Sequence, residues 1–157
     1  MSRSVRSAGT AIVATLILSA IAARFPAPSD ACSLLTKEDA AAALGEAATG
    51  PKATGFISDG TGTTVSACEY TGSGIHSIKL DLTRIPASSV SMYKQMCARQ
   101  KNDGLAGMGD VACWYKDKHE ELHVMTGTAF VSIELRRSGD PTGPIKALMK
   151  KALARLK

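Results

Sequence analysis

The chain has 157 residues, with 19 Lys and Arg against 14 Asp and Glu, which gives a formal net charge of +5. Aromatic residues make up only 4% of it, and this scarcity counts against a platform that stacks the bases of single-stranded nucleic acid. About 135 residues remain once an N-terminal leader is removed, which is enough for one hydrophobic core and too few for two ordinary domains.

The N-terminus has the layout of a secretory signal peptide. Arg3 and Arg6 precede an apolar stretch, residues 8–23, that carries no charge. The stretch is shorter than the roughly 20 residues that a membrane-spanning helix needs, so we predict cleavage rather than permanent anchoring. Because the first cysteine, Cys32, does not directly follow the apolar stretch, we expect no lipid anchor.

These features predict three segments: a signal peptide at residues 1–22, a short linker at 23–31, and a single domain at 32–157. Loss of the two leader arginines lowers the net charge to +3. We expect the mature protein to be periplasmic or secreted.

The mature part holds all four cysteines, namely Cys32, Cys68, Cys97 and Cys113. An even number of cysteines in an oxidising compartment predicts two disulfides. A four-cysteine zinc site needs pairs two to four residues apart, whereas the intervals here are 36, 29 and 16. Spacing alone leaves three pairings open.

The first predicted element is a helix that begins after Thr36. Thr36 can cap it and Asp39 stands at the third position, which completes a capping box, while Gly45 ends the helix. Residues 49–64 are rich in Gly, Thr, Ser and Pro, and we predict a surface loop there.

Two strands are predicted next, at residues 65–70 and 75–85, joined by a tight link at 71–74. In the second strand Ile78, Leu80 and Leu82 alternate with polar residues. This pattern gives one buried face and one solvated face, which is typical of an antiparallel sheet.

A second helix is predicted from about Ser88 to Lys101, with Cys97 on its inward face, followed by a glycine-rich turn at 104–110. Three further strands are predicted at 111–116, near 121–126, and at 129–137. Trp114 lies in the first of these, and we favour a position in the core over an exposed contact.

The terminal segment predicts the clearest helix. Its apolar residues recur at helical spacing at Ile145, Leu148, Met149, Ala152, Leu153 and Leu156. The opposite face is basic, with Lys146, Lys150, Lys151, Arg155 and Lys157. We interpret it as a solvated face, and keep docking on an anionic surface or membrane as an alternative.

A weak internal sequence repeat, here called the internal echo, bears on how the cysteines pair. The sequences around Cys68 and Cys113 are similar, and each follows a segment with one earlier cysteine at or in a helix. This echo favours the pairs Cys32 with Cys68 and Cys97 with Cys113.

The string HEELH, from His119 to His123, matches the H-E-x-x-H pattern in which zinc peptidases place two histidines on one helix and use the glutamate as base. Here the string leads into an alternating segment typical of a strand, where the two histidine Cα atoms would lie about 13 Å apart. Zinc–nitrogen bonds of about 2.0–2.1 Å cannot close that distance. We predict a polar hairpin end, and keep a zinc-dependent hydrolase using His119, Glu120 and His123 as an alternative.

Other catalytic patterns are weaker. The glycine-rich turn leads from a helix into a strand, whereas phosphate-binding loops lead from a strand into a helix. Neither G-x-S-x-G nor a Walker sequence occurs. We therefore expect no catalytic residue and no cofactor.

Four short motifs occur in order along the mature chain, at residues 32–39 (CSLLTKED), 43–45 (ALG), 68–70 (CEY) and 107–112 (GMGDVA). With them the chain resembles domain-of-unknown-function family 3558, small exported proteins and lipoproteins. The likeness spans most of residues 31–157. It implies an extracytoplasmic α+β domain without established enzymatic activity, and it implies pairing of Cys32 with Cys68. The chain departs from the family in lacking a lipobox and in carrying Cys97 and Cys113.

Together these observations predict an α+β fold with about five mostly antiparallel strands, helices packed on one face, and the order α-β-β-α-β-β-β-α. We expect an exported, non-catalytic binding module, such as an inhibitor, sensor or envelope accessory protein. Its partner is expected to be an envelope or extracellular protein or polymer, with no nucleic acid and at most peripheral membrane contact. We expect a monomer.

Overall fold

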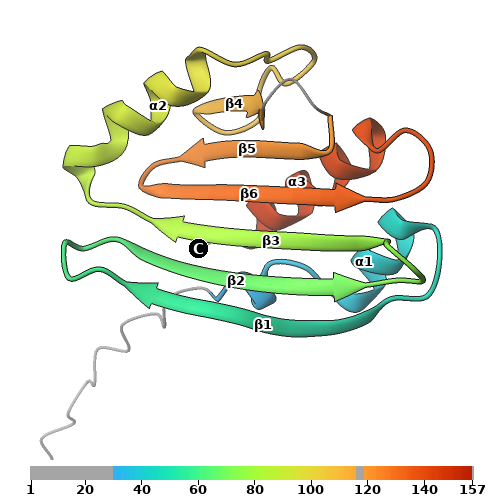
Figure 1. Ribbon diagram of the computed structural model, residues 1–157. Coiled ribbons are helices and arrows are strands. Elements are labelled where there is room, and N and C mark those ends of the chain that lie inside the picture. Colours follow the sequence, from blue (N-terminus) through green and yellow to red (C-terminus); the bar gives the residue numbers. More distant parts are fainter. Residues whose placement is uncertain (1–29, 116–118, 157) are drawn as a thin grey trace, which may run out of the picture.

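The computed structural model describes residues 30–115 and 119–156 (Figure 1). The predicted signal peptide and all but the last two residues of the predicted linker lie outside the described residues. The described chain forms one six-stranded antiparallel sheet with helices packed on it, so the α+β prediction is confirmed. No helix within residues 30–115 and 119–156 is long and apolar enough to cross a membrane.

The first helix forms where its capping residues predict it. After the short 3-10 turn η1 (Ala31–Ser33), α1 (Lys37–Leu44) begins with a capping box. The Thr36 hydroxyl accepts the Asp39 N–H at 3.2 Å, and the Asp39 carboxylate accepts the Thr36 N–H at 3.0 Å. Gly45 ends the helix with a left-handed backbone, φ 77°, which glycine adopts without steric cost.

The sheet consists of two meanders of three strands each. They are β1 (Thr49–Ser58), β2 (Thr64–Thr71) and β3 (Ser77–Arg84), then β4 (Val111–Trp114), β5 (Glu121–Thr126) and β6 (Ala129–Arg136). The order across the sheet is β1-β2-β3-β6-β5-β4, so the meanders join through the antiparallel pair of β3 and β6 (Figure 1). Every strand except β1 lies close to a predicted one.

The strand β1 corrects the prediction of a loop at residues 49–64. All ten of its residues are exposed, so it carries no alternation of buried and solvated side chains from which a strand is predicted. The strand forms because its backbone pairs with that of β2. The pairing has register irregularities between Thr49 and Lys52 and between Ala53 and Gly55. Only residues 59–63 remain as the loop.

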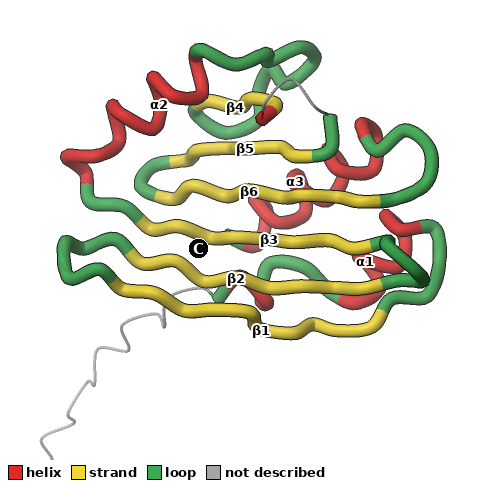
Figure 2. The backbone as a smooth tube through the Cα atoms, viewed as in Figure 1, coloured by secondary structure: helices red, strands yellow, loops and turns green. Residues whose placement is uncertain are grey.

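One face of the sheet, here called the covered face, packs against α1 and α3 (Thr142–Arg155), which lie behind the sheet in Figure 2. Ile78, Leu80 and Leu82 of β3 are fully or almost fully buried there. The predicted apolar stripe of the terminal helix supplies the other side of this core, with Ile145, Leu148, Met149 and Ala152 buried.

The remaining helix, α2 (Val90–Ala98), packs on the opposite face, which differs from the prediction that all helices share one face. The register of the β5–β6 hairpin turns Val124 and Val131 toward the covered core, and therefore turns Met125 and Phe130 the other way. These two apolar side chains must also be shielded from solvent on that face. Tyr93 of α2 provides it, with its ring 5.1 Å from that of Phe130.

Each meander has its own disulfide. Cys32 pairs with Cys68 and joins η1 to β2, and Cys97 pairs with Cys113 and joins α2 to β4. This is the pairing that the internal echo favoured. The first bridge lies on the covered face and the second on the opposite face, because Cys68 pairs with Leu80 whereas Cys113 pairs with His123.

Candidate binding site

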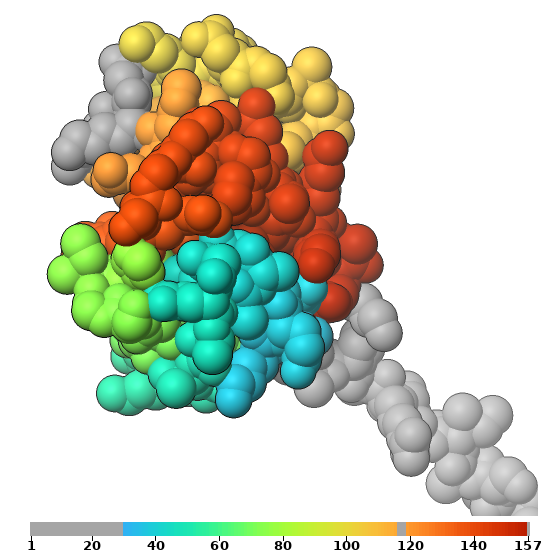
Figure 3. Space-filling view, turned by 90° about the vertical axis from the view of Figure 1, so that its right-hand side faces the viewer, coloured from blue at the N-terminus to red at the C-terminus, as the bar shows by residue number. Residues whose placement is uncertain are grey.

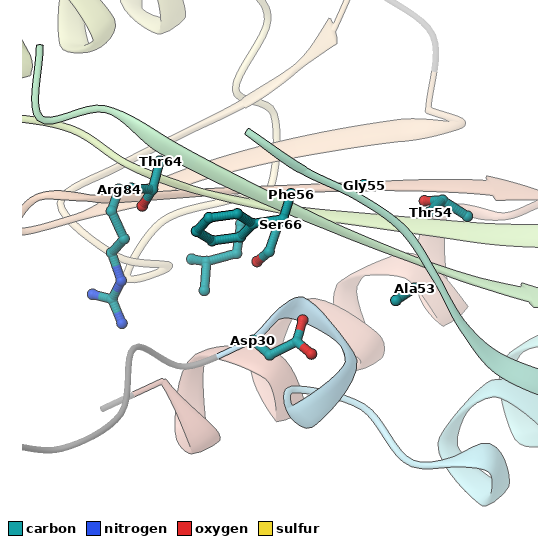
Figure 4. A pocket seen from close by; sticks show the side chains of 9 residues that line it. Asp30, Ala53, Thr54, Gly55, Phe56, Thr64, Ser66 and Arg84 are labelled. Atoms are coloured by element: carbon teal, nitrogen blue, oxygen red, sulfur yellow. The ribbon is translucent and has the colours of Figure 1, made fainter. Parts of the chain in front are cut away.

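A hollow of about 570 Å³ lies between the covered face of β1–β3 and the segment at Asp30, where the described chain begins (Figure 4). We call it the β1 hollow. Its lining combines apolar side chains, hydroxyls and one charge of each sign, from Asp30, Ala53, Thr54, Gly55, Phe56, Thr64, Ser66, Leu82 and Arg84. Sites for small molecules and peptides commonly have this mixture of an apolar lining and a few polar groups.

The register of three strands builds the hollow. Phe56 of β1 pairs with Ser66 of β2, and Ser66 pairs with Leu82 of β3, so all three side chains point to the covered face. Cys68, two residues after Ser66, points to the same face, and its disulfide with Cys32 holds η1 over that part of the sheet. The hollow is therefore the continuation of the core beyond the edge of η1.

The floor of the hollow is held in place by several bonds. The Ala31 N–H donates to the Ser66 hydroxyl at 3.0 Å, and Ser66 is only 8% exposed. The Asp30 carboxylate accepts the Cys32 N–H at 3.3 Å, and the Ser33 hydroxyl donates to the Asp30 carbonyl at 2.6 Å. With the disulfide, these bonds make the floor rigid before any ligand arrives.

Two neighbouring apolar residues stand exposed beside the hollow. Phe56 is 68% exposed and its ring overhangs the hollow (Figure 4). Ile57 is 64% exposed and, as the next residue of the strand, points to the other face. An exposed aromatic ring that overhangs a hollow can contact a ligand held there. Because β1 is at the edge of the sheet, its outer backbone groups pair with no other described strand.

The structure does not bring the two histidines of the HEELH string together. β5 begins at Glu121, so His123 lies on a strand, as predicted. Its ring stacks on Tyr115 at 4.9 Å, whereas the His119 ring lies 4.8 Å from Trp114. Tyr115 and Trp114 are adjacent in the chain and face opposite sides of the sheet.

The glutamates of the string do not supply a metal site either. His123 Nε2 lies 2.7 Å from Glu121 Oε1, and Glu120 is exposed. Within residues 30–115 and 119–156 no group of three His, Cys, Asp or Glu side chains is close enough to hold a metal ion. This geometry does not support the zinc-hydrolase alternative.

Trp114 is fully buried in the main core, as favoured from the sequence. The basic face of α3 is less uniform than predicted. Lys151 and Arg155 both bind the Asp39 carboxylate of α1, whereas the Lys146 ammonium lies 5.7 Å over the Trp114 ring. Lys157 lies outside the described residues.

Three loops meet at one end of the molecule around His76, the end that faces the viewer in Figure 3. His76 Nδ1 lies 2.7 Å from Glu46 Oε1, and Nε2 lies 3.0 Å from the Ser138 hydroxyl. This order of acid, imidazole and hydroxyl is that of hydrolase triads. Sequence reasoning missed it because the three residues are far apart in the chain and match no motif.

The hydrogen bonds around His76 indicate a structural role rather than a catalytic one. We call this hydrogen-bonded group of Glu46, Ser73, His76 and Ser138 the clasp, because it joins the three loops. The Ser138 backbone N–H also donates to Nε2, at 3.2 Å, so the base is already occupied. Glu46 also accepts the Ser73 N–H and hydroxyl, at 2.8 and 2.6 Å. The bonds from Ser73, followed by that from His76, lower the pKa of the Glu46 carboxyl to about 2.

The β1 hollow could not be predicted from the sequence, since Phe56 falls in the segment that was predicted to be a loop. The chain matches no protein-family profile, no curated protein and no solved structure.

Proposed function

We propose that this chain is an exported, non-catalytic binding module that captures an extended segment of a partner protein at the β1 hollow. Two disulfides and the lack of a membrane-spanning helix within the described residues are compatible with export. Localisation in the periplasm or outside the cell, after removal of residues 1–22, is part of this proposal. So is the likeness to domain-of-unknown-function family 3558.

The observation that carries the proposal is the position of the hollow beneath an edge strand. An extended peptide can add to such a strand through main-chain hydrogen bonds, with pockets for alternate side chains providing specificity. The pairing of β1 runs without irregularity from Gly55 to Ser58, and Phe56 in this stretch overhangs the hollow. Every second side chain of an added strand would point to the covered face beside Phe56, and an apolar side chain there can pack against the Phe56 ring.

The irregular part of β1 narrows the docking region. Register shifts, together with Pro51 and Lys52, lie in the first half of the strand, and all three features discourage indiscriminate pairing at sheet edges. Only the regular stretch from Gly55 to Ser58 would then pair with an added strand. The hollow then restricts that partner to sequences with a suitable apolar residue.

The test compares two neighbouring residues of equal exposure. Peptides selected by phage display on the mature protein should bind Phe56→Ser at least tenfold more weakly than wild type, since burying one large apolar side chain contributes about 1.5–3 kcal/mol. Ile57→Ser, which removes a similar side chain from the other face, should bind almost as well as wild type. Titration calorimetry measures both.

Peptides methylated on alternate backbone nitrogens separate strand addition from simple apolar contact, because only strand addition needs the peptide N–H groups. The proposal fails if no selected peptide distinguishes Phe56→Ser from Ile57→Ser, or if methylated and unmethylated peptides bind equally.

A further inference from the structure

The terminal helix divides its basic residues between two stripes. Lys151 and Arg155 both bind the Asp39 carboxylate, at 2.6 and 2.5 Å, so both cationic groups are engaged within the fold. Lys146 and Lys150, one turn apart, instead face the glycine-rich turn between α2 and β4. The two stripes therefore have different roles.

A groove of about 540 Å³ runs between this second stripe and the turn, and we call it the α3 groove. Its lining contains the two lysines, no acid, and the apolar side chains of Met108, Leu153, Ala154 and Leu156. Lys146 and Leu156 are ten residues apart, about 15 Å along the helix. The groove thus has a cationic end and an apolar end.

The wall opposite the helix is fixed to the core. Gly109 has φ 66°, and a Cβ there would lie 2.5 Å from Val124 and 2.6 Å from the Met125 carbonyl, so the turn sits directly on β5. The Trp114 indole N–H donates to the Asp103 carbonyl at 3.3 Å. Both contacts hold the wall in place, so the groove exists without a ligand.

A second glycine lets Lys146 approach the wall. A Cβ on Gly104 would lie 2.9 Å from the Lys146 ammonium, which also lies 5.7 Å over the ring of Trp114. The ammonium is thus placed at the cationic end of the groove by the turn on one side and the indole on the other.

We infer that the α3 groove binds an amphiphilic anion, with its carboxylate or phosphate group at Lys146 and Lys150 and its alkyl chain along Met108, Leu153 and Leu156. Charge complementarity selects the acid group, and the apolar end of the groove selects the chain. This site is separate from the β1 hollow and stands independently of the function proposed there.

Trp114 reports on the site directly, because it is the single tryptophan of the chain and lies against Lys146. Dodecanoate and dodecyl phosphate, kept below their micellar concentrations, should change the Trp114 emission of the mature protein in a saturable way. Dodecyl maltoside has the same chain without a charge, and acetate and inorganic phosphate have the charge without a chain. All three should bind at least tenfold more weakly.

Two pairs of variants assign the site, with calorimetry as the measurement that does not depend on Trp114. Lys150→Ala should weaken dodecanoate binding about tenfold, whereas Lys79→Ala removes one charge from the opposite face of the sheet and should not change it. Ala154→Phe fills the groove and should abolish binding. Ala147→Phe changes an exposed residue two turns nearer the start of the same helix and outside the lining of the groove, and should leave binding intact.

Phe56→Ser should bind dodecanoate as wild type does, so failure of the first proposal and failure of this one are distinguishable. Equal binding of dodecyl maltoside and dodecanoate would overturn the inference, as would equal losses in the two members of either variant pair. Binding to phosphatidylglycerol vesicles without binding to the monomeric amphiphiles would also overturn it, in favour of docking on a membrane surface.

Discussion

At the scale of single residues, Asp39 has the largest number of roles. It completes the capping box of α1 and binds Lys151 and Arg155 of α3, while its own side chain is only 7% exposed. Burial alone would raise the pKa of its carboxyl. Hydrogen bonds from Lys151, from the Thr36 N–H and from Arg155 outweigh burial and hold the pKa well below its usual range.

We expect Asp39→Asn to lower the free energy of unfolding at pH 7 by about 1–2 kcal/mol, because both cations are half exposed and screened by solvent. Asp39→Ala also removes the acceptor for the Thr36 N–H in the capping box and should cost about 1 kcal/mol more. Urea denaturation followed by circular dichroism measures both values. A variant as stable as wild type would contradict this account.

The same group predicts a pH dependence. Its pKa is lower in the folded chain than the value of about 3.9 in the unfolded chain, so its stabilising contribution is complete above that value and is lost as the pH falls below it. The difference in unfolding free energy between wild type and Asp39→Asn should therefore shrink between pH 7 and pH 2. A constant difference would show that the carboxylate charge is not involved.

The clasp around Glu46 makes a second prediction at this scale. With a carboxyl pKa of about 2, Glu46 should keep its bonds from Ser73 at pH 4 and lose them only as the pH falls toward that value. Hydrogen exchange by NMR should find the Ser73 N–H protected at pH 4 in wild type and unprotected in Glu46→Ala. Glu120→Ala, which changes an exposed glutamate outside this cluster, is the control.

At the scale of elements, the two disulfides differ in the length of chain they close. The Cys32–Cys68 bridge spans 36 residues and the Cys97–Cys113 bridge 16, which corresponds to about 4 and about 3 kcal/mol in the chain-entropy description. The first also holds η1, which directly follows the lining residue Asp30, against β2.

We expect the double variant Cys32→Ser with Cys68→Ser to be less stable than Cys97→Ser with Cys113→Ser. Only the first should weaken peptide binding at the hollow, because only it releases η1. Chemical denaturation and calorimetry of the two double variants test this, and equal binding losses would contradict it.

The elements also explain what the sequence could predict. Thr36, Asp39 and Gly45 define α1 locally, and the alternation around Leu80 and Ile133 defines β3 and β6, because burial on one face leaves a periodic pattern. β1 has no buried face and left no such pattern. β1 forms only because its backbone pairs with β2, so neither β1 nor the hollow beside it could be predicted from residues 49–58.

The prediction that α2 shares a face with the other helices was wrong for a related reason. Its sequence indicates a helix with an inward stripe, but the face of the sheet that it covers depends on Met125 and Phe130, more than 25 residues further along the chain. The α3 groove was hidden in the same way. The basic residues of the terminal helix form a single face in the sequence, and only contact with Asp39 and Trp114 divides them.

At the scale of the whole molecule, the two meanders share one core. The β3–β6 pair joins them within the sheet, and the contact between α1 and α3 joins them above it, where blue and red segments meet in Figure 3. The main core runs without interruption from Leu34 and Tyr70 to Trp114 and Leu122.

We therefore expect one cooperative unfolding transition, although each meander has its own disulfide. Trp114 emission, which reports the second meander, and far-ultraviolet circular dichroism, which reports the whole chain, should have the same midpoint in urea. Two separate midpoints would mean that the meanders unfold independently.

The order of the cysteines has a consequence for oxidative folding. Each bridge joins two cysteines that are consecutive in the chain, the first with the second and the third with the fourth. A polypeptide that emerges from a translocation channel with its N-terminus first presents Cys32 and Cys68 to a thiol oxidase before the later pair arrives. For this chain, if it is exported as proposed above, we expect the native bridges to form in order of emergence without a disulfide isomerase.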